Sequence, residues 1–172
     1  MIEIIYLDMD GVLTDFTKRY TELFKTEPEK VPKKKWTPFW EEFVGGEHFK
    51  TLDWHPAGKE LYAGVYDYAK TNGLRIDILT SAGGDHMIDS IAYQKRRWLV
   101  ENKVQHRYLH VVPGKRYKKD FAASNAVIID DMESVIARFR ENGGNAIHHT
   151  GDAKATLEKL VSGNYESKDR QV

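Results

Sequence analysis

The chain contains no cysteine among its 172 residues. Disulfide bonds, thiolate nucleophiles and zinc sites with cysteine ligands are therefore excluded, and this composition is the one expected in a reducing cytoplasm. Long apolar runs are absent too, and the mean hydropathy is −0.59, so we predict no transmembrane helix. The chain begins with a strand-like segment and not with a basic and apolar leader. We expect a soluble cytoplasmic protein.

Neither sign of charge is in excess, because 26 lysine and arginine residues balance 26 aspartate and glutamate residues. No overall field then attracts the protein to nucleic acid or to an anionic membrane, and recognition of charge must be local. We interpret the run Lys33-Lys34-Lys35 as a solvated loop. We therefore expect neither membrane association nor a stable complex with nucleic acid.

Short apolar runs recur along the chain, and segments with helical spacing lie between them. This alternation predicts an α/β protein with a parallel sheet, because parallel strands are buried on both faces and need helical crossovers. The expected strands are Ile2 to Leu7, Leu74 to Leu79, Tyr108 to Val112, Ala126 to Ile129 and Ala146 to His148. The length suits one well-buried domain with a small appendage.

One stretch, residues 17–56, interrupts the alternation and has no convincing strand. It contains aromatic residues at helical spacing, and a predicted helix start with Thr37 as N-cap and Pro38 at the first helical position. We interpret it as a small helical cap over the sheet. The predicted organisation is a core of residues 1–16 and 57–164, a cap of residues 17–56, and a flexible polar tail of residues 165–172.

Acidic residues follow the first predicted strand in the segment Asp8-Met9-Asp10-Gly11. Open parallel sheets bind ligands at the carboxyl edge, which is where Asp8 is placed. Carboxylates at positions i and i+2 can share a site in which one attacks as a nucleophile and the other transfers a proton. Gly11 permits a sharp turn and lets backbone amides approach an anion. Taken alone, the segment is also explained as a turn with acidic caps.

Polar and cationic groups are predicted at the ends of the next two strands. The segment Thr80-Ser81-Ala82 stands at a strand-to-helix junction, where hydroxyls and free backbone amides suit the oxygens of a phosphate. Lys115, Lys118 and Lys119 follow the third strand, and a lysine at this edge can neutralise an aspartate and a bound phosphate. A helix cap and solvated surface lysines are the plainer alternatives.

The fourth strand closes with a second acidic pair, Asp130 and Asp131. Carboxylates that meet at one edge of a sheet repel each other unless a cation lies among them. A small number of hard oxygen ligands favours Mg²⁺ with retained waters. Mg²⁺ is therefore the predicted cofactor.

Together these segments resemble the four ordered motifs of the haloacid dehalogenase (HAD) superfamily: Asp8-Met9-Asp10-Gly11-Val12, Thr80-Ser81, a downstream lysine and Asp130-Asp131. Within the superfamily, the chain is most similar to 5′(3′)-deoxyribonucleotidases. That narrower likeness lies in Asp8 to Phe16, Phe49 to Gly58, and Thr80-Ser81 followed by Gln94-Lys95-x-x-Trp98-Leu99. The resemblance implies a Rossmann-like three-layer core with a five-stranded parallel sheet, Asp8 on the central strand, and a cap inserted after the first motif.

The resemblance also implies a mechanism of phosphate ester hydrolysis. Asp8 attacks phosphorus and forms an aspartyl-phosphate, while Asp10 protonates the leaving alkoxide and then activates water. Mg²⁺ is bound by Asp8, the backbone carbonyl of Asp10 and the final acidic pair. In that pair Asp131 is preferred to Asp130 as the direct ligand.

Other residues are expected to hold the substrate. Thr80 and a lysine would bind the equatorial phosphate oxygens, and Lys118 is preferred to Lys115 and Lys119 because it stands before Phe121-Ala122 at a predicted helix start. The remaining expected contacts with substrate are made by Gly11, Ser81, Ala82 and Lys115.

The substrate depends on the cap. Phe16, Trp40 and Phe43 either form a stacking surface for a nucleobase or form the small core that a cap of this size needs. We expect a small phosphate ester, first of all a nucleoside monophosphate. The alternatives are sugar phosphates, polynucleotide end phosphates, and a non-catalytic binding protein with this fold. The sequence leaves the base, the sugar, the 5′ or 3′ position and the oligomeric state open, with a homodimer as one option.

Overall fold

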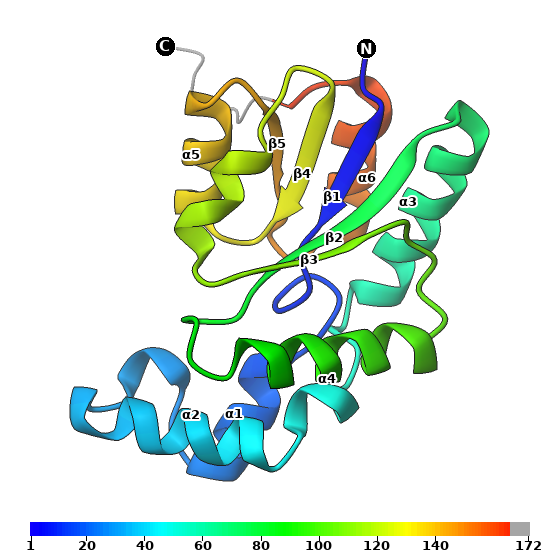
Figure 1. The fold of residues 1–172 in the computed structure, drawn as a ribbon. Coiled ribbons are helices and arrows are strands. Elements are labelled where there is room, and N and C mark those ends of the chain that lie inside the picture. Colours follow the sequence, from blue (N-terminus) through cyan, green and yellow to red (C-terminus); the bar gives the residue numbers. More distant parts are fainter. Residues whose placement is uncertain (166–172) are drawn as a thin grey trace.

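The computed structural model describes residues 1–165, which form an α/β fold around one five-stranded sheet (Figure 1). The strands are β1 (Ile4–Leu7), β2 (Arg75–Ser81), β3 (Leu109–Val112), β4 (Ala126–Asp130) and β5 (Asn145–His148). All neighbouring strands are parallel, and their order is β3-β2-β1-β4-β5. The predicted fold class and the central position of the first strand are confirmed.

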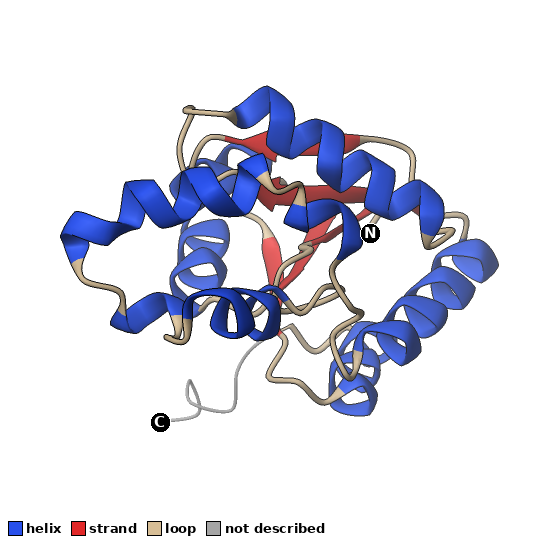
Figure 2. Ribbon diagram, turned by 90° about the horizontal axis from the view of Figure 1, so that it is seen from below, coloured by secondary structure: helices blue, strands red, loops and turns tan. Residues whose placement is uncertain are grey.

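Helices cover both faces of the sheet (Figure 2), because successive side chains of a strand point to opposite sides. Ile5 and Leu7 of β1 pack in one hydrophobic cluster with residues of several helices, and Tyr6 packs in a second cluster on the other face. The first cluster includes α3 (Gly58–Asn72), α4 (Ile88–Glu101) and α6 (Ala153–Ser162), and the second includes α5 (Glu133–Glu141) and the 3-10 helix η4 (Lys115–Phe121). The core thus has three layers.

Two strands run further than the apolar pattern indicates. β2 continues through Thr80 and Ser81, which pair with Val111 and Val112 of β3. β4 includes Asp130, which pairs with His148 of β5. Backbone pairing with a neighbour does not depend on side-chain polarity, so these strands extend past their last aliphatic residue. The sheet itself therefore fixes the position of these polar side chains.

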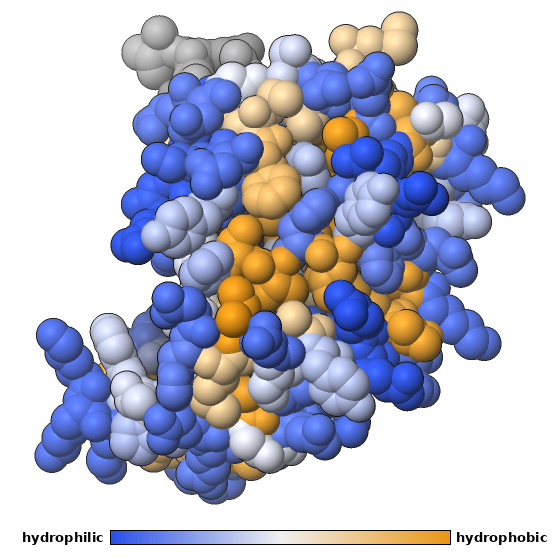
Figure 3. Space-filling model, viewed as in Figure 1, coloured by the Kyte–Doolittle hydropathy of each residue, from blue (hydrophilic) through white to orange (hydrophobic). Residues whose placement is uncertain are grey.

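The insertion between β1 and α3 is helical, as predicted. It contains α1 (Phe16–Phe24), η1 (Pro28–Lys30), η2 (Lys33–Lys35), α2 (Trp36–Gly45) and η3 (His48–Thr51). Hydrophilic side chains cover most of the visible surface of this cap (Figure 3), and the three lysines of η2 are exposed.

Both helix starts in the cap lie close to the predicted positions but differ in detail. α1 begins at Phe16, so the expected boundary after residue 16 falls inside this helix, whose N-cap is Asp15. α2 begins at Trp36 and not after Thr37, and its N-cap Lys35 makes no side-chain capping bond. Pro38 still lies in the first turn, where a missing backbone N–H leaves no hydrogen bond unmade. The Thr37 cap was therefore a wrong prediction.

Hydrogen bonds from α4 attach the cap to the core. The Gln94 side chain accepts from Phe49 N at 3.1 Å and donates to Val44 O at 2.8 Å. Trp98 Nε1 donates to Leu52 O at 2.8 Å. All these groups are buried, and their hydrophobic neighbours belong to the same cluster as β1. The cap and the core therefore share one continuous interior.

The predicted tail begins at Tyr165, which is partly buried against the main hydrophobic cluster. The rest of that tail, residues 166–172, lies outside the described residues. Among residues 1–165, no helix combines the length and the apolar character needed to cross a membrane.

Candidate active site

The polar residues predicted to share a site lie at one edge of the sheet. β1 pairs with β2 and β4, so the carboxyl ends of these three strands meet. Asp8 follows β1, Ser81 ends β2 and Asp130 ends β4. A depression of about 270 Å³ opens there, which we call the acidic depression. Its lining includes Asp8, Asp10, Gly11, Ser81, Lys118 and Asp131.

Asp8 is held rigidly and is almost fully buried. Its Oδ1 accepts hydrogen bonds from Met9 N at 2.8 Å and from Lys118 Nζ at 3.0 Å. Burial raises the pKa of Asp8 well above its usual value, and the charge of Asp130 adds to this effect, while Lys118 opposes it. The other carboxylate oxygen, Oδ2, remains free of these two contacts. Asp8 can therefore present one oxygen atom to a substrate in the depression.

Lys118 is the only one of the three candidate lysines that is buried. Its Nζ lies 2.7 Å from Asp130 Oδ2, in addition to its contact with Asp8. Burial alone would lower the pKa of Lys118, but the charges of Asp8 and Asp130 raise it above its usual value. The ammonium form of Lys118 is therefore favoured at neutral pH, and Lys118 joins Asp8, which follows β1, to Asp130 at the end of β4.

Three carboxylates form a group that can hold a cation. One oxygen each from Asp8, Asp130 and Asp131 lies within 4.8 Å of the others. Both oxygens of Asp130 are already used, because Oδ2 contacts Lys118 and Oδ1 accepts from Met132 N at 2.9 Å. Asp131 is half-buried, and burial together with the charge of Asp130 raises its pKa. Three carboxylates with a single lysine among them fit a divalent cation, with Asp131 better placed than Asp130 to bind it directly.

Gly11 is required by the close approach of Asp131. A Cβ at this position would overlap with the Asp131 carboxylate, and the backbone φ of +82° is one that residues with side chains rarely adopt. The glycine therefore lets the loop after β1 fold against the fourth strand. Its role in this structure is to bring the two acidic pairs together.

Asp10 faces the same depression from the other side and has two partners of its own. Its Oδ1 accepts from Thr14 Oγ1 at 2.9 Å, and its Oδ2 accepts from Lys95 Nζ at 3.1 Å. The Asp10 side chain retains 28% exposure, whereas that of Asp8 retains 7%. The Asp10 side chain is therefore accessible to water, while that of Asp8 is shielded.

Lys95 of α4 is a site residue that the sequence analysis did not identify. It is 1% exposed, and its Nζ donates to Thr80 Oγ1 at 2.5 Å and to Ser81 O at 3.0 Å, as well as to Asp10. Its ammonium group also lies 5.0 Å from the centre of the Phe49 ring. The sequence offered a signal in the segment Gln94-Lys95-x-x-Trp98-Leu99, which is part of the family resemblance, but the sequence analysis assigned no role to Lys95.

The expected contacts of β2 with substrate need correction. Thr80 is fully buried and, among residues 1–165, is not part of the lining of the acidic depression. Ala82 is fully buried too, and its N–H donates to Val112 O at 2.8 Å, so this amide is not available for a phosphate. Ser81 does line the depression. Of these β2 residues, Ser81 is therefore the one that faces the depression, while Thr80 accepts a hydrogen bond from Lys95.

The aromatic residues of the cap divide between the two roles that the sequence left open. Phe43 is fully buried within the interior of the cap, so the structure does not bring its ring to a substrate. Phe16 and Trp40 are half-buried and line the acidic depression, with their ring centres 6.0 Å apart in an edge-to-face arrangement. Lys115 is exposed and lines the same depression.

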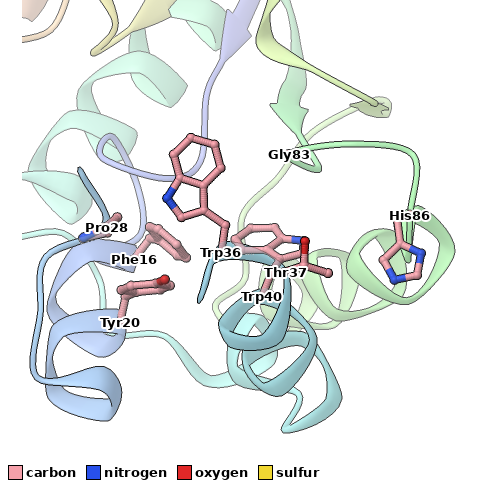
Figure 4. A pocket seen from close by; sticks show the side chains of 8 residues that line it. All are labelled: Phe16, Tyr20, Pro28, Trp36, Thr37, Trp40, Gly83 and His86. Atoms are coloured by element: carbon pink, nitrogen blue, oxygen red, sulfur yellow. The ribbon is translucent and has the colours of Figure 1, made fainter. Parts of the chain in front are cut away.

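An aromatic cleft of about 370 Å³ adjoins the acidic depression, and Figure 4 shows the side chains that line this cleft. It is lined by Phe16, Tyr20, Pro28, Trp36, Thr37, Trp40, Gly83 and His86. Four of these residues, Phe16, Pro28, Trp40 and Gly83, also line the acidic depression. A ligand bound beside Asp8 can therefore extend into the cleft.

Two histidines, His148 and His149, lie beside the acidic residues. Nothing in the sequence indicated this position. His148 Nε2 is 2.9 Å from Asp131 O, and His149 N donates to Asp130 O at 2.9 Å. The His149 ring is buried, with Nδ1 2.7 Å from Thr156 Oγ1 and Nε2 without a partner among residues 1–165. Burial, and next the charge of His55, lowers the pKa of His149 to about 4. His149 is therefore neutral at physiological pH and supports the site structurally.

The lowered pKa of His149 predicts a loss of stability in acid. The unfolded chain takes up this proton near pH 6.5 and the folded chain only near pH 4, so stability is complete above the first value and falls between the two. The loss should be roughly 1–3 kcal/mol. It is measured as the difference in urea unfolding free energy between the native chain and His149→Gln at pH 7.5 and pH 4.5. That difference should shrink in acid; a difference that is the same at both pH values would contradict the assignment.

No model of a known protein family matches this sequence, and no curated protein matches it. Solved structures do match over most of the chain. A HAD-superfamily hydrolase from Ehrlichia chaffeensis has a TM-score of 0.57 at 10% identity, and the match covers 94% of this chain and 98% of that one. A phosphonoacetaldehyde hydrolase-like protein from Oleispira antarctica has a TM-score of 0.58 at 13% identity, covering 99% and 80% of the two chains.

An L-2-haloacid dehalogenase from Xanthobacter autotrophicus is similar as well, with a TM-score of 0.54 at 13% identity and coverage of 96% and 85%. Likeness at these low identities establishes the fold and not the reaction. The chain therefore has the fold of HAD-superfamily hydrolases, as the sequence motifs predicted.

Proposed function

We propose that this protein is a Mg²⁺-dependent phosphomonoesterase of the HAD superfamily with Asp8 as its nucleophile. The observation that carries the proposal is the pair of carboxylates at the end of β1. Asp8 is buried and fixed by Lys118, while Asp10 is accessible and held by Thr14 and Lys95 in the same depression. One carboxylate is thus suited to attack and the other to transfer protons.

In the proposed reaction, an oxygen of Asp8 forms a bond to phosphorus as the bond to the leaving alkoxide breaks. Asp10 gives its proton to that alkoxide, and it then takes a proton from the water that attacks the aspartyl-phosphate. Asp8, Asp131 and the backbone carbonyl of Asp10 would hold Mg²⁺, whose positive charge would offset the negative charge of carboxylate and phosphate. Lys118 and Ser81 hold phosphate oxygens, so most of the catalysis is positioning and electrostatic stabilisation.

Asp10 supports hydrolysis of phosphate esters over dehalogenation, although a dehalogenase is among the proteins of similar fold. A phosphate ester releases an alkoxide that needs a proton, and Asp10 lies where it can provide one. Displacement of a halide needs no proton for the leaving group. An accessible carboxylate held by two side chains beside the nucleophile is therefore better explained by a phosphatase.

We further propose a nucleoside monophosphate as the substrate, on the pattern of the 5′(3′)-deoxyribonucleotidases that the sequence resembles. The aromatic cleft adjoins the acidic depression and offers Phe16 and Trp40 to a flat base. Stacking of a base on an aromatic side chain contributes about 1–3 kcal/mol and accepts different bases.

Replacing Trp40 with leucine tests the place of the base. The KM for nucleoside monophosphates should rise about tenfold, because the ring that stacks on the base is lost, while kcat changes little. The KM for a sugar phosphate without a base should stay unchanged, and Tyr93→Leu, at an exposed position of α4, should leave both values unchanged. If Trp40→Leu raises the KM for both substrates by the same factor, the base does not bind in the aromatic cleft.

Replacing Lys95 with methionine tests its role as a positioning residue. Lys95 holds both Asp10 and Thr80, so the variant should lose about 10- to 100-fold in kcat with little change in KM. Its kcat should fall less with p-nitrophenyl phosphate, whose leaving group needs no proton. The control is Lys59→Met, at an exposed position at the start of α3. A purely structural role of Lys95 would lower activity towards both substrates by the same factor.

The reaction itself is tested by phosphate release from a panel of deoxy- and ribonucleoside monophosphates, sugar phosphates and 3′-phosphorylated oligonucleotides. Each is measured with Mg²⁺ and after chelation. We expect release that requires Mg²⁺ and is fastest with nucleoside monophosphates. Preference for a sugar phosphate or an oligonucleotide would replace the nucleotide assignment alone, and no release from any ester would overturn the catalytic proposal.

A further inference from the structure

A second depression, of about 430 Å³, adjoins the acidic depression and has no cap residue in its lining, and we call it the basic pocket. It is lined by Gly83, Gly84, Asp85, Pro113, Gly114, Lys115, Arg116, Tyr117 and Arg138. Gly83 and Lys115 line both depressions, and Gly83 also lines the aromatic cleft. A ligand at Asp8 therefore has an aromatic surface on one side and this pocket on another.

Positive charge is concentrated in the basic pocket. Lys115, Arg116 and Arg138 contribute three cations, against the single carboxylate of Asp85. Within residues 1–165, none of these cations forms an ion pair with a carboxylate. The whole chain carries equal numbers of cationic and anionic residues, so this excess is local. An anion would gain from it without breaking an existing ion pair.

Three glycines of two adjoining loops, Gly83, Gly84 and Gly114, contribute to the lining of the pocket. The loop after β2 is joined to the loop after β3 by a hydrogen bond from Gly84 N to Pro113 O. Arg116 is held over the ring of Tyr117, with its guanidinium carbon 4.8 Å from the ring centre, and it donates to the Tyr117 hydroxyl at 2.9 Å. Because this side chain is already oriented, less conformational entropy is lost when it binds an anion.

We propose that the basic pocket binds a second phosphate group of the substrate, so that the preferred substrate is a compact bisphosphate. This inference rests on the proposed function, because it requires a phosphate ester at Asp8. In a nucleoside 3′,5′-bisphosphate, one phosphate lies in the acidic depression, the other lies between Arg116 and Arg138, and the base lies in the aromatic cleft. An internucleotide phosphate of a short oligonucleotide has the same chemistry and is the other source of such a group.

The test measures dissociation constants by calorimetry, with the Asp8→Asn chain to prevent turnover and with free Mg²⁺ held constant. Deoxyadenosine 5′-monophosphate is compared with deoxyadenosine 3′,5′-bisphosphate, and a hexose 6-phosphate with the hexose 1,6-bisphosphate. Each bisphosphate should bind about tenfold more tightly than its monophosphate, an advantage that falls as ionic strength rises. A ratio close to one for both pairs would overturn the proposal.

Variants that remove positive charge from the basic pocket test whether this pocket causes the tighter binding of the bisphosphate. Arg138→Gln should reduce the bisphosphate advantage about threefold, and Arg116→Gln with Arg138→Gln should abolish it, while affinity for the monophosphate stays the same. The matched control is Arg96→Gln, at an exposed position on α4 that lies outside all three depressions. An advantage that survives the double replacement, or that Arg96→Gln lowers equally, would contradict the assignment to this pocket.

The same titrations separate the two proposals and the two sources of phosphate. If the hexose bisphosphate binds more tightly than the hexose monophosphate, while nucleotides bind no more tightly than the corresponding hexose phosphates, the basic pocket is supported and the nucleotide assignment is overturned. If nucleoside monophosphates bind more tightly than hexose phosphates, but neither bisphosphate binds more tightly than its monophosphate, the nucleotide assignment is supported and the basic pocket proposal is overturned. A 5′-phosphorylated dinucleotide serves as the third ligand. A gain for it alone would overturn the compact bisphosphate in favour of a polynucleotide end, and a gain below that of the bisphosphate supports the proposal.

Discussion

Replacement of Asp8 by asparagine is expected to lower phosphate release by about 10⁴-fold or more, because the amide cannot form the covalent intermediate. The fold should survive this change. Burial and the charge of Asp130 raise the pKa of Asp8, so its charged form costs stability in the folded state at neutral pH. The neutral amide removes that cost. The free energy of unfolding should therefore be equal to or higher than that of the native chain.

Two measurements check this prediction together: the rate of phosphate release and the urea unfolding midpoint. Asp67→Asn, at an exposed position on α3, is the matched control and should leave both unchanged. Loss of activity with full stability would separate a chemical role of Asp8 from a structural one. Activity within tenfold of the native rate would show that Asp8 is not the nucleophile.

The second large effect is expected at Lys118. Its replacement by methionine removes a cation that contacts both Asp8 and Asp130, and it leaves two buried carboxylates facing each other. Removal of one partner from a buried ion pair typically costs about 3–5 kcal/mol, and we expect a loss of this size in the free energy of unfolding. Turnover should fall by about 10²-fold or more, because a group that binds the developing charge is lost.

Urea unfolding with Mg²⁺ and with a chelator checks the Lys118 prediction. Added Mg²⁺ should restore part of the stability of Lys118→Met, because a second cation then lies among the carboxylates. Lys119→Met, at the exposed neighbouring position, should change stability by less than about 0.5 kcal/mol. A Lys118→Met chain that is as stable as the native one in chelator would contradict the described electrostatics of the site.

The sheet and its acidic edge could be predicted because they depend on local pattern and on topology. Buried parallel strands are continuous apolar runs, and the polar residue after each run must lie at the carboxyl edge. From this pattern alone, Asp8 and Asp130 are predicted to lie at the same edge of the sheet. Lys118 was preferred to Lys115 because a helix start was predicted at Lys118, and this ground was wrong, because η4 begins at Lys115 and Lys118 lies in its middle. What distinguishes Lys118 in the structure is its burial.

Other parts of the site depend on tertiary packing, which the sequence does not specify. Lys95 has the spacing of a core residue of α4, and only the position of that helix shows that its ammonium group reaches Asp10. Trp40 and Phe43 lie three residues apart on α2, but one lines the cleft and the other is fully buried. The backbone amide of Ala82 is not available to bind a phosphate, because it donates its hydrogen bond to Val112 O of β3. Such outcomes follow from contacts between distant segments.

In the proposed reaction, Asp8 forms a bond to phosphorus, and Asp10 donates a proton to the leaving group and then accepts one from water. This reaction is tested most directly by mixing the Asp10→Asn chain with radiolabelled p-nitrophenyl phosphate, whose leaving group departs without a proton. We predict a burst of one p-nitrophenol per chain, slow turnover afterwards, and a phosphoryl label that peptide mapping places on Asp8. Turnover without a burst, or a label on any other residue, would contradict the account.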